Sequence, residues 1–206
     1  MADLDSIGQF PTSPGMAAVN FKAISPTQIT QTNSGKIRRY GYGVTYYEWT
    51  CRFGSQTEEN MGPLLGYISA AKGPSLSFEI ILPQISYSKS TNPPSTTPQT
   101  NALFSKGVTQ VTLDNCGASK QVLRGGDFFK FNNHTKVYQC TTTCTSDGSG
   151  VATLNFTNAL LTEVPDNTAL TITAVPFTAI LDGEEQSWNV GNGGITNLDI
   201  GMREVF

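Results

Sequence analysis

The chain contains a single histidine, His134, and this limits the chemistry that the sequence can support. A serine or cysteine nucleophile activated by histidine would need this residue, and so would a histidine-based metal site. His134 lies in Asn132-Asn-His-Thr135, a run typical of a tight turn, and no Gly-x-Ser-x-Gly motif or zinc-type cysteine spacing accompanies it. We therefore interpret His134 as a turn residue and predict no metal and no other cofactor.

Two pairs of adjacent glutamates are the other candidates for catalysis, because a cell-wall glycosidase needs only two carboxyl groups beside a cleft. Glu58-Glu59 precedes a predicted helix, where negative charge is favourable. Glu184-Glu185 follows Asp182-Gly183 in a predicted acidic turn. Neither pair has the apolar surroundings that would raise one carboxyl pKa for acid catalysis. We expect a protein that is not an enzyme, with a cell-wall-degrading activity as the weakest alternative.

The four cysteines are expected to be free, buried thiols. Cys51 and Cys116 are isolated, whereas Cys140 and Cys144 are separated by three threonines. An extended segment would hold these last two Cα atoms about 13 Å apart, beyond the roughly 7 Å that a disulfide tolerates. A turn could still close this gap, so a Cys140–Cys144 disulfide remains an open alternative.

The composition indicates a β-rich protein with little charge. Charged residues make up 14% of the 206 residues and aromatic residues 10%, with a net charge of −3. Typical domains have about 25% charged residues. The low net charge and the aromatic content argue against disorder, and the chain has no basic cluster of the kind that binds nucleic acid. No run of about 18 apolar residues predicts a membrane span, and residues 1–5 do not resemble the start of a signal peptide. We expect a soluble protein made in a cytoplasm.

The first half of the chain predicts an arm, aromatic strands and one helix. Residues 1–34 contain three prolines and scattered apolar side chains, which indicates an extended arm that lies on its own domain or on a neighbouring subunit. Between residues 36 and 53 the alternation of aromatic residues reverses its phase at Tyr46-Tyr47, which predicts a bulge or bend there. Apolar residues at i, i+3, i+4 and i+7 predict a helix at about 60–72, capped by Asn60.

The second half predicts a small β-module. A loop rich in Ser, Thr and Pro covers residues 84–105, and short strand patterns separated by glycine turns follow over 105–175. Such spacing is typical of a small barrel or sandwich. Residues 176–206 then predict a closing strand. The fold class is mainly β.

Several segments resemble tail and baseplate proteins of tailed bacteriophages. The resemblance is carried by Ser34-Gly-Lys-Ile-Arg-Arg39, Tyr47-Glu-Trp-Thr-Cys-Arg-Phe53, the helix with its early Pro63, and Lys72-Gly-Pro-Ser-Leu-Ser-Phe78. A second stretch, from Leu123-Arg-Gly-Gly-Asp-Phe-Phe-Lys-Phe131 to Asp147-Gly-Ser-Gly-Val-Ala-Thr-Leu154, is similar to the small β-barrel inserted in the same group.

The resemblance implies a tail-tube-like β-sandwich or barrel core with one packed helix and an inserted small β-barrel. The domains would be an N-terminal arm (1–34), the core (35–104 with 176–206) and the module (105–175). Similar distal tail and tail-tube subunits form rings, commonly hexameric, around the tail channel. The expected role is therefore a structural subunit of the virion, assembled in the host cytoplasm as a ring or adaptor at the distal end of the tail tube. Its partners would be copies of itself and other tail proteins.

Two sets of residues are predicted to make these contacts. The candidate subunit-interface residues are Phe10, Phe21, Tyr40, Tyr42, Met202 and Phe206. An alternative function is a binding module for a receptor-binding protein or a host glycan, with Tyr87 and Phe128 as candidate partner-binding residues. Strand alternation places Phe128 opposite Phe129 and Phe131, so one of these sets should be exposed if the alternative holds.

Overall fold

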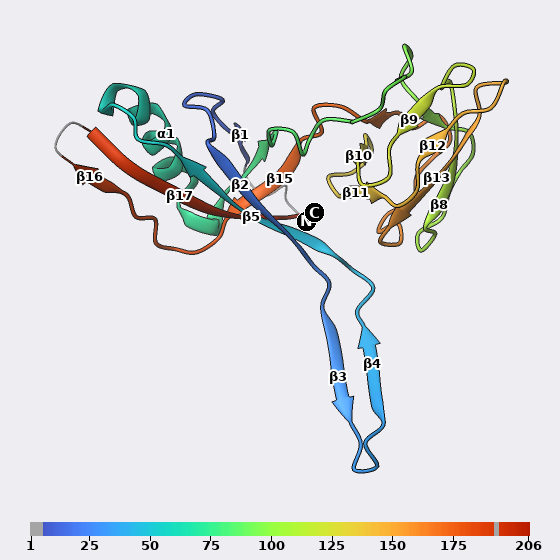
Figure 1. Cartoon of the computed structure of the whole chain (residues 1–206), viewed down its shortest axis with the longest axis horizontal. Coiled ribbons are helices and arrows are strands. Elements are labelled where there is room, and N and C mark those ends of the chain that lie inside the picture. The colour runs from blue at the N-terminus through green and yellow to red at the C-terminus, as the bar shows by residue number, and fades with distance from the viewer. Residues whose placement is uncertain (1–5, 192–193) are drawn as a thin grey trace.

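A computed structural model describes residues 6–191 and 194–206, and most of this chain forms β-strands. The mainly β fold class is confirmed: one α-helix is present in these residues, together with a nearly closed, barrel-like sheet of six strands. Figure 1 shows a larger sheet with the helix on one side, the small barrel on the other, and a hairpin that projects away from both.

The larger sheet has seven strands. Its order is β1 (Ser6–Gln9), β6 (Ser77–Ile80), β15 (Phe177–Leu181), β17 (Gly194–Glu204), β5 (Tyr46–Phe53) and β2 (Ala18–Ile24), and β16 (Asn189–Gly191) pairs with β17. β1 pairs with β6 in parallel, and the other pairs are antiparallel. Strands from both ends of the chain therefore form one sheet.

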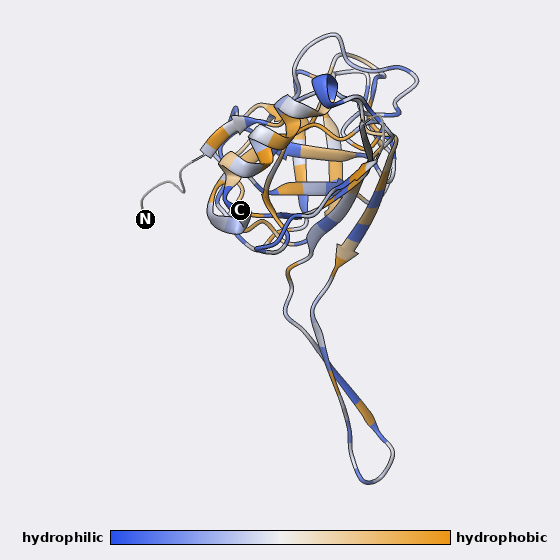
Figure 2. Ribbon diagram, turned by 90° about the vertical axis from the view of Figure 1, so that its left-hand side faces the viewer, coloured by the Kyte–Doolittle hydropathy of each residue, from blue (hydrophilic) through white to orange (hydrophobic). Residues whose placement is uncertain are grey.

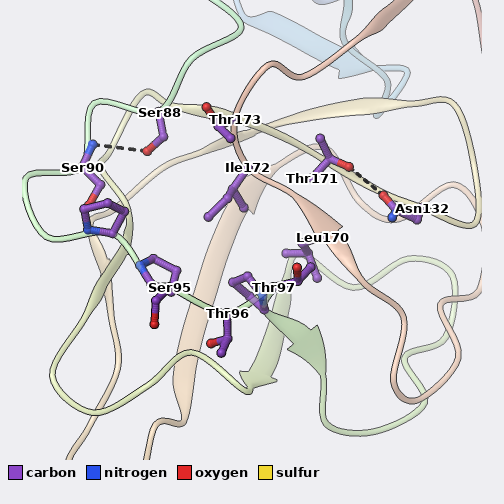
Figure 3. Close-up of a pocket in the computed structure, with 13 residues that line it drawn as sticks. Ser88, Ser90, Ser95, Thr96, Thr97, Asn132, Leu170, Thr171, Ile172 and Thr173 are labelled. Atoms are coloured by element: carbon purple, nitrogen blue, oxygen red, sulfur yellow. Dashed lines mark hydrogen bonds between the residues drawn. The ribbon is translucent and has the colours of Figure 1, made fainter.

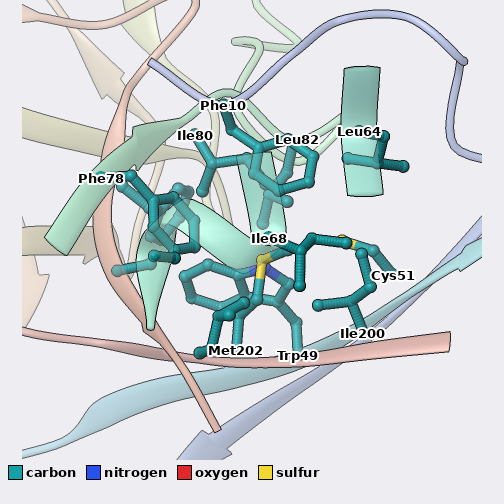
Figure 4. Close-up of a cluster of buried hydrophobic side chains, with 14 of the residues drawn as sticks. Phe10, Trp49, Cys51, Leu64, Ile68, Phe78, Ile80, Leu82, Ile200 and Met202 are labelled. Atoms are coloured by element: carbon teal, nitrogen blue, oxygen red, sulfur yellow. The ribbon is translucent and has the colours of Figure 1, made fainter. Parts of the chain in front are cut away.

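One face of this sheet is covered by α1 (Glu58–Ala71). Alternation along β5 buries Tyr47, Trp49, Cys51 and Phe53, as a half-exposed strand requires. The helix contributes a matching apolar stripe, and Figure 4 shows the two layers in contact. The buried helix residues are Met61, Leu64, Ile68 and Ala71.

The helix begins two residues earlier than predicted, at Glu58, with Thr57 as its N-cap residue. The backbone N–H groups of Asn60 and Met61 both donate to the Thr57 carbonyl, so Asn60 is already inside the first turn. Pro63 consequently lies within the helix rather than in its first turn. The helix ends at Lys72, which has a φ of 52°, and the 3-10 turn η1 (Gly73–Ser75) follows.

The N-terminal segment is part of the fold rather than a separate arm. β1 and β2 are strands of the larger sheet, and Phe10 is 4% exposed, because the chain after β1 places its ring against Phe53 and Phe78. Residues 1–5 of the expected arm lie outside the described residues.

The segment that does extend from the fold is a hairpin of β3 (Thr27–Gln31) and β4 (Ile37–Gly41). The predicted bend at Tyr46-Tyr47 is wrong: the strands break at residues 42–45, between β4 and β5. The two phases of alternation belong to two separate strands: β4 is exposed, whereas β5 has one buried face.

The barrel has the strand order β14 (Leu170–Thr171), β10 (Phe128–Phe131), β11 (Val137–Cys140), β13 (Ala152–Thr157), β8 (Gln110–Asp114) and β7 (Gln99–Thr100). The Thr100 N–H donates to the Thr168 carbonyl at 3.0 Å, and the Leu170 N–H donates to the Pro98 carbonyl at 3.0 Å. These bonds join the first and last strands. A short pair, β9 (Gln121–Leu123) and β12 (Cys144–Thr145), lies beside them.

The Pro-rich loop, expected outside the module, is bonded to the barrel. The Ser90 hydroxyl donates to the Gln121 carbonyl, and Ser88 Oγ and the Lys89 N–H both donate to the Asp127 carboxylate. The barrel unit therefore begins well before residue 105, because the loop supplies its first strand and several of its hydrogen bonds.

Candidate subunit interface

The β3–β4 hairpin exposes large apolar side chains that contact no core. Its four large apolar residues are at least 60% exposed: Ile29, Ile37, Tyr40 and Tyr42. Every residue of both strands is exposed, and Figure 2 shows the hairpin standing clear of the rest of the chain with apolar positions along it. An isolated two-stranded hairpin is at best marginally stable in water, so a further layer is needed to hold this one.

Both faces of the hairpin carry the same kinds of side chain. Residues that pair directly share a face, so the pairs Ile29–Arg39 and Gln31–Ile37 place two isoleucines and one arginine together. The pairs Gln28–Tyr40 and Thr30–Arg38 occupy the other face. The hairpin is therefore apolar and basic on two sides.

The charge of the hairpin is entirely positive. Lys36, Arg38 and Arg39 are the charged residues between positions 25 and 45. Within the described residues, none of the three forms an ion pair. These cations therefore remain available for an acidic partner surface.

The six predicted interface residues divide into three groups. Tyr40 and Tyr42 are exposed on or beside the hairpin, with ring centroids 5.5 Å apart, and Phe206 is exposed at 50%. Phe21 is half-buried among aromatic rings. Phe10 and Met202 are buried in the core of their own chain, and the expectation that they contact a neighbour is not met in this structure. Met202 faces inward because it alternates with the exposed Arg203 along β17.

The two predicted partner-binding residues do not form one site. Tyr87 is 47% exposed and borders a cavity of about 380 Å³ together with Phe10. Phe128 is 8% exposed, because its ring packs against Tyr47 and Phe177. Phe129 and Phe131 are also fully buried, so the expected exposed set is absent from this strand.

A cavity of about 580 Å³ lies instead between the Pro-rich loop and β14. Figure 3 shows hydroxyl groups of Ser88, Ser90 and Thr171 around Ile172. All three hydroxyls already donate within the chain: Ser88 to Asp127, Ser90 to the Gln121 carbonyl, and Thr171 to Asn132.

The glutamates considered for catalysis form two pairs, one near each end of α1. Glu58, Glu59, Glu184 and Glu185 are all exposed. All four cysteines are free and buried, as expected, and burial raises the pKa of the Cys51 thiol to about 12. No group of three or more metal-ligating side chains occurs among the described residues.

Four of the exposed apolar residues that sequence reasoning missed lie in two groups. Ile29 and Ile37 lie on the hairpin, and Trp188 and Val190 lie at β16. The run Thr32-Asn-Ser-Gly35 was the available signal for the hairpin, because such residues favour a turn and Gly35 has a φ of 81° there.

The chain was compared with protein-family models and with curated proteins. The chain matches no protein-family model, and no curated protein is significantly similar to it. Within residues 6–191 and 194–206, no helix has the length and hydropathy needed to cross a membrane.

Proposed function

We propose that this protein is a structural subunit of a bacteriophage virion that assembles with copies of itself into a ring or adaptor at the distal end of the tail tube. The observation that carries the proposal is the β3–β4 hairpin, which exposes Ile29, Ile37 and Tyr40 at 60% or more. A neighbouring subunit would bury these side chains and stabilise the hairpin.

The energetics favour burial of the hairpin in an assembly. Burying a large apolar side chain contributes about 1.5–3 kcal/mol, and the hairpin exposes three such residues on its two faces, with Tyr42 directly after it. Permanent interfaces are large and apolar at their centres. The low charge of the chain fits this role, together with the resemblance to tail and baseplate subunits.

The test is a variant in which residues 27–41 are replaced by a short glycine–serine turn. Because this segment contacts no core, we expect the variant to retain the far-UV circular dichroism of the remaining fold. Light scattering after size exclusion and electron microscopy should show oligomers or rings for the original chain and monomers for the variant. A chain that stays monomeric at high concentration, with no incorporation into tail assemblies, would contradict the proposal.

A second candidate function rests on the cavity of about 580 Å³ beside the Pro-rich loop. Hydroxyl groups and Ile172 at one opening are suited to a sugar, so the barrel would bind a host-surface glycan. A glycan array that compares the original chain with Ile172→Glu tests this role. Hits that the substitution abolishes would support it, and an array without hits would dismiss it.

A further inference from the structure

A second exposed apolar surface lies at β16, on a different part of the molecule from the hairpin. Trp188 is 42% exposed and Val190 is 66% exposed. Among the described strands β16 pairs with β17 alone, so it forms an edge of the sheet. Edge strands with exposed apolar side chains are sites where another strand can add to a sheet.

This edge runs beside the helix. The backbone before β16 approaches the helix end, where a Cβ at Gly73 would lie 3.3 Å from the Glu184 Cα. The first residue of β17 approaches the helix start, where a Cβ at Gly194 would lie 2.6 Å from the Gln56 carbonyl oxygen. The helix termini therefore belong to the same surface as β16.

The surface around β16 is acidic. Glu184 and Glu185 precede the strand, and Glu58 and Glu59 lie at the helix start; all four are exposed. Lys72, at the helix end, is the nearby cation. These carboxylates outnumber the ammonium group of Lys72, so the charge of this surface is opposite in sign to that of the hairpin. We define Glu58, Glu59, Glu184, Glu185, Trp188 and Val190 as the β16 surface.

We propose that the β3–β4 hairpin of one copy docks on the β16 surface of a second copy. The partner is a second copy because one chain carries both complementary surfaces, which lie apart in Figure 1. Arg39, which shares a face with Ile29 and Ile37, meets the glutamates, and the two isoleucines cover Trp188 and Val190. The contact is head-to-tail, so successive copies close into a ring where the rotation permits. This inference rests on the proposed self-assembly and specifies its interface.

Charge exchange between the two surfaces tests the docking. One variant carries Arg38→Glu and Arg39→Glu, and the other carries Glu184→Lys and Glu185→Lys. Each variant alone then presents two surfaces of like charge. We expect the concentration at the midpoint of assembly to rise at least about tenfold for each, a change that corresponds to about 1.4 kcal/mol.

An equal mixture of the two variants should assemble again. The acidic hairpin of the first variant meets the basic β16 surface of the second, and the original pairing operates in the other direction. The mixture should therefore form assemblies of alternating copies, which light scattering detects. All four positions are exposed, and far-UV circular dichroism checks that both variants remain folded.

Lys106→Glu and Glu163→Lys supply matched controls, because both residues are exposed on the barrel away from the two surfaces. These controls should assemble like the original chain. If the original chain assembles and the exchanged variants assemble equally well, the docking is wrong while self-assembly stands. If the original chain forms no assembly, the proposed self-assembly fails as well. If the mixture does not recover, pairing between these two surfaces is overturned.

Discussion

His134 is held in a chain of hydrogen bonds that requires a neutral imidazole. Asn133 Nδ2 donates to the Glu163 carbonyl, which turns Asn133 Oδ1 toward His134 Nδ1 at 2.8 Å. His134 Nε2 lies 3.0 Å from the hydroxyl of Tyr138, which accepts the Leu161 N–H. Thus Nδ1–H donates to Asn133 and Nε2 accepts from Tyr138. This arrangement explains the histidine as a structural residue of the barrel.

The stability of the protein should depend on pH through His134. Burial, followed by the charges of Lys130 and Lys136, lowers the pKa of His134 to about 4. Below its ordinary value of about 6.5 the unfolded chain takes up a proton that the folded chain does not, so stability is lost as pH falls from about 6.5 to 4.

Urea unfolding across this range measures the effect. His134→Gln should flatten the slope in that window, where one proton accounts for at most about 1.4 kcal/mol per pH unit. Comparison of the two curves removes the contribution of carboxylates common to both proteins. Parallel curves for the two proteins would show that His134 does not titrate differently on folding.

Lys136 and Glu204 form a buried ion pair between the barrel and the last strand of the sheet. The Lys136 ammonium lies 2.5 Å from the Glu204 carboxylate, and both side chains are at most 1% exposed. The backbone N–H groups of Val137 and Tyr47 also donate to this carboxylate. Burial raises the pKa of Glu204 and lowers that of Lys136, while their mutual attraction opposes both shifts.

Glu204→Gln should lower the free energy of unfolding by about 3–5 kcal/mol, because it leaves the buried Lys136 without a charge partner. The matched control is Arg52→Ala, which removes an exposed ion pair with Asp199 and should cost less than about 1 kcal/mol. Urea unfolding at pH 7 measures both. Equal losses for the two variants would refute a special role for the buried pair.

Among the secondary-structure elements, the hairpin differs most from the others. α1 and the central strands of both sheets bury an apolar face, whereas every residue of β3 and β4 is exposed. Elements without tertiary contacts open most readily. The hairpin should therefore be the most protease-sensitive part of the unassembled chain.

Limited digestion with trypsin should cut first after Lys36, Arg38 or Arg39. Assembly should slow these cuts at least about tenfold, because docked backbone cannot enter the protease unless it first opens. Mass spectrometry of the early fragments identifies the sites, and cleavage at Lys106 serves as the reference in both states. First cuts in the barrel would contradict the exposed, unpacked hairpin.

The chain as a whole contains two hydrophobic cores that meet at an aromatic junction. Phe129 and Phe131 belong to the barrel core, whereas Phe128 and Val137, from the same two barrel strands, pack into the core of the larger sheet. The Phe21 ring lies against Phe128 at 5.4 Å. Adjacent residues of one strand thus contribute to both cores, and we expect the two cores to fold together for this reason.

Phe128→Ala should cost about 3–5 kcal/mol and separate the unfolding of the two cores. Both tryptophans, Trp49 and Trp188, lie in the larger-sheet part, so fluorescence reports that part and far-UV circular dichroism reports the barrel as well. The two transitions should coincide in the original chain and diverge in the variant. Leu103→Ala, at an exposed barrel position, should leave them coincident; coincident curves for Phe128→Ala would argue against coupling through this ring.

Much of the local structure could be predicted from the pattern of residues. The stripe Met61, Leu64 and Ile68 specified the helix, and alternation with glycine turns indicated the strands of a mainly β fold with a small barrel. These patterns are local because backbone geometry repeats every 3.6 residues in a helix and every two in a strand. The helix start was misplaced by two residues, because the first-turn hydrogen bonds run to the Thr57 carbonyl. The beginning of the barrel was misplaced because hydrogen bonds from the Pro-rich loop to distant residues decide it.

Only the tertiary structure decided which aromatic residues belong to the candidate interface. Tyr40 and Phe10 are both aromatic residues in extended segments, yet one is 65% exposed and the other is buried. The side chains of neighbouring strand residues point to opposite faces of the sheet, but a face is buried only if a distant segment packs on it. Other segments pack on both sides of β10, so its aromatic residues belong to the core. No segment of the described chain packs on either side of the hairpin, so its apolar residues remain free for an interface.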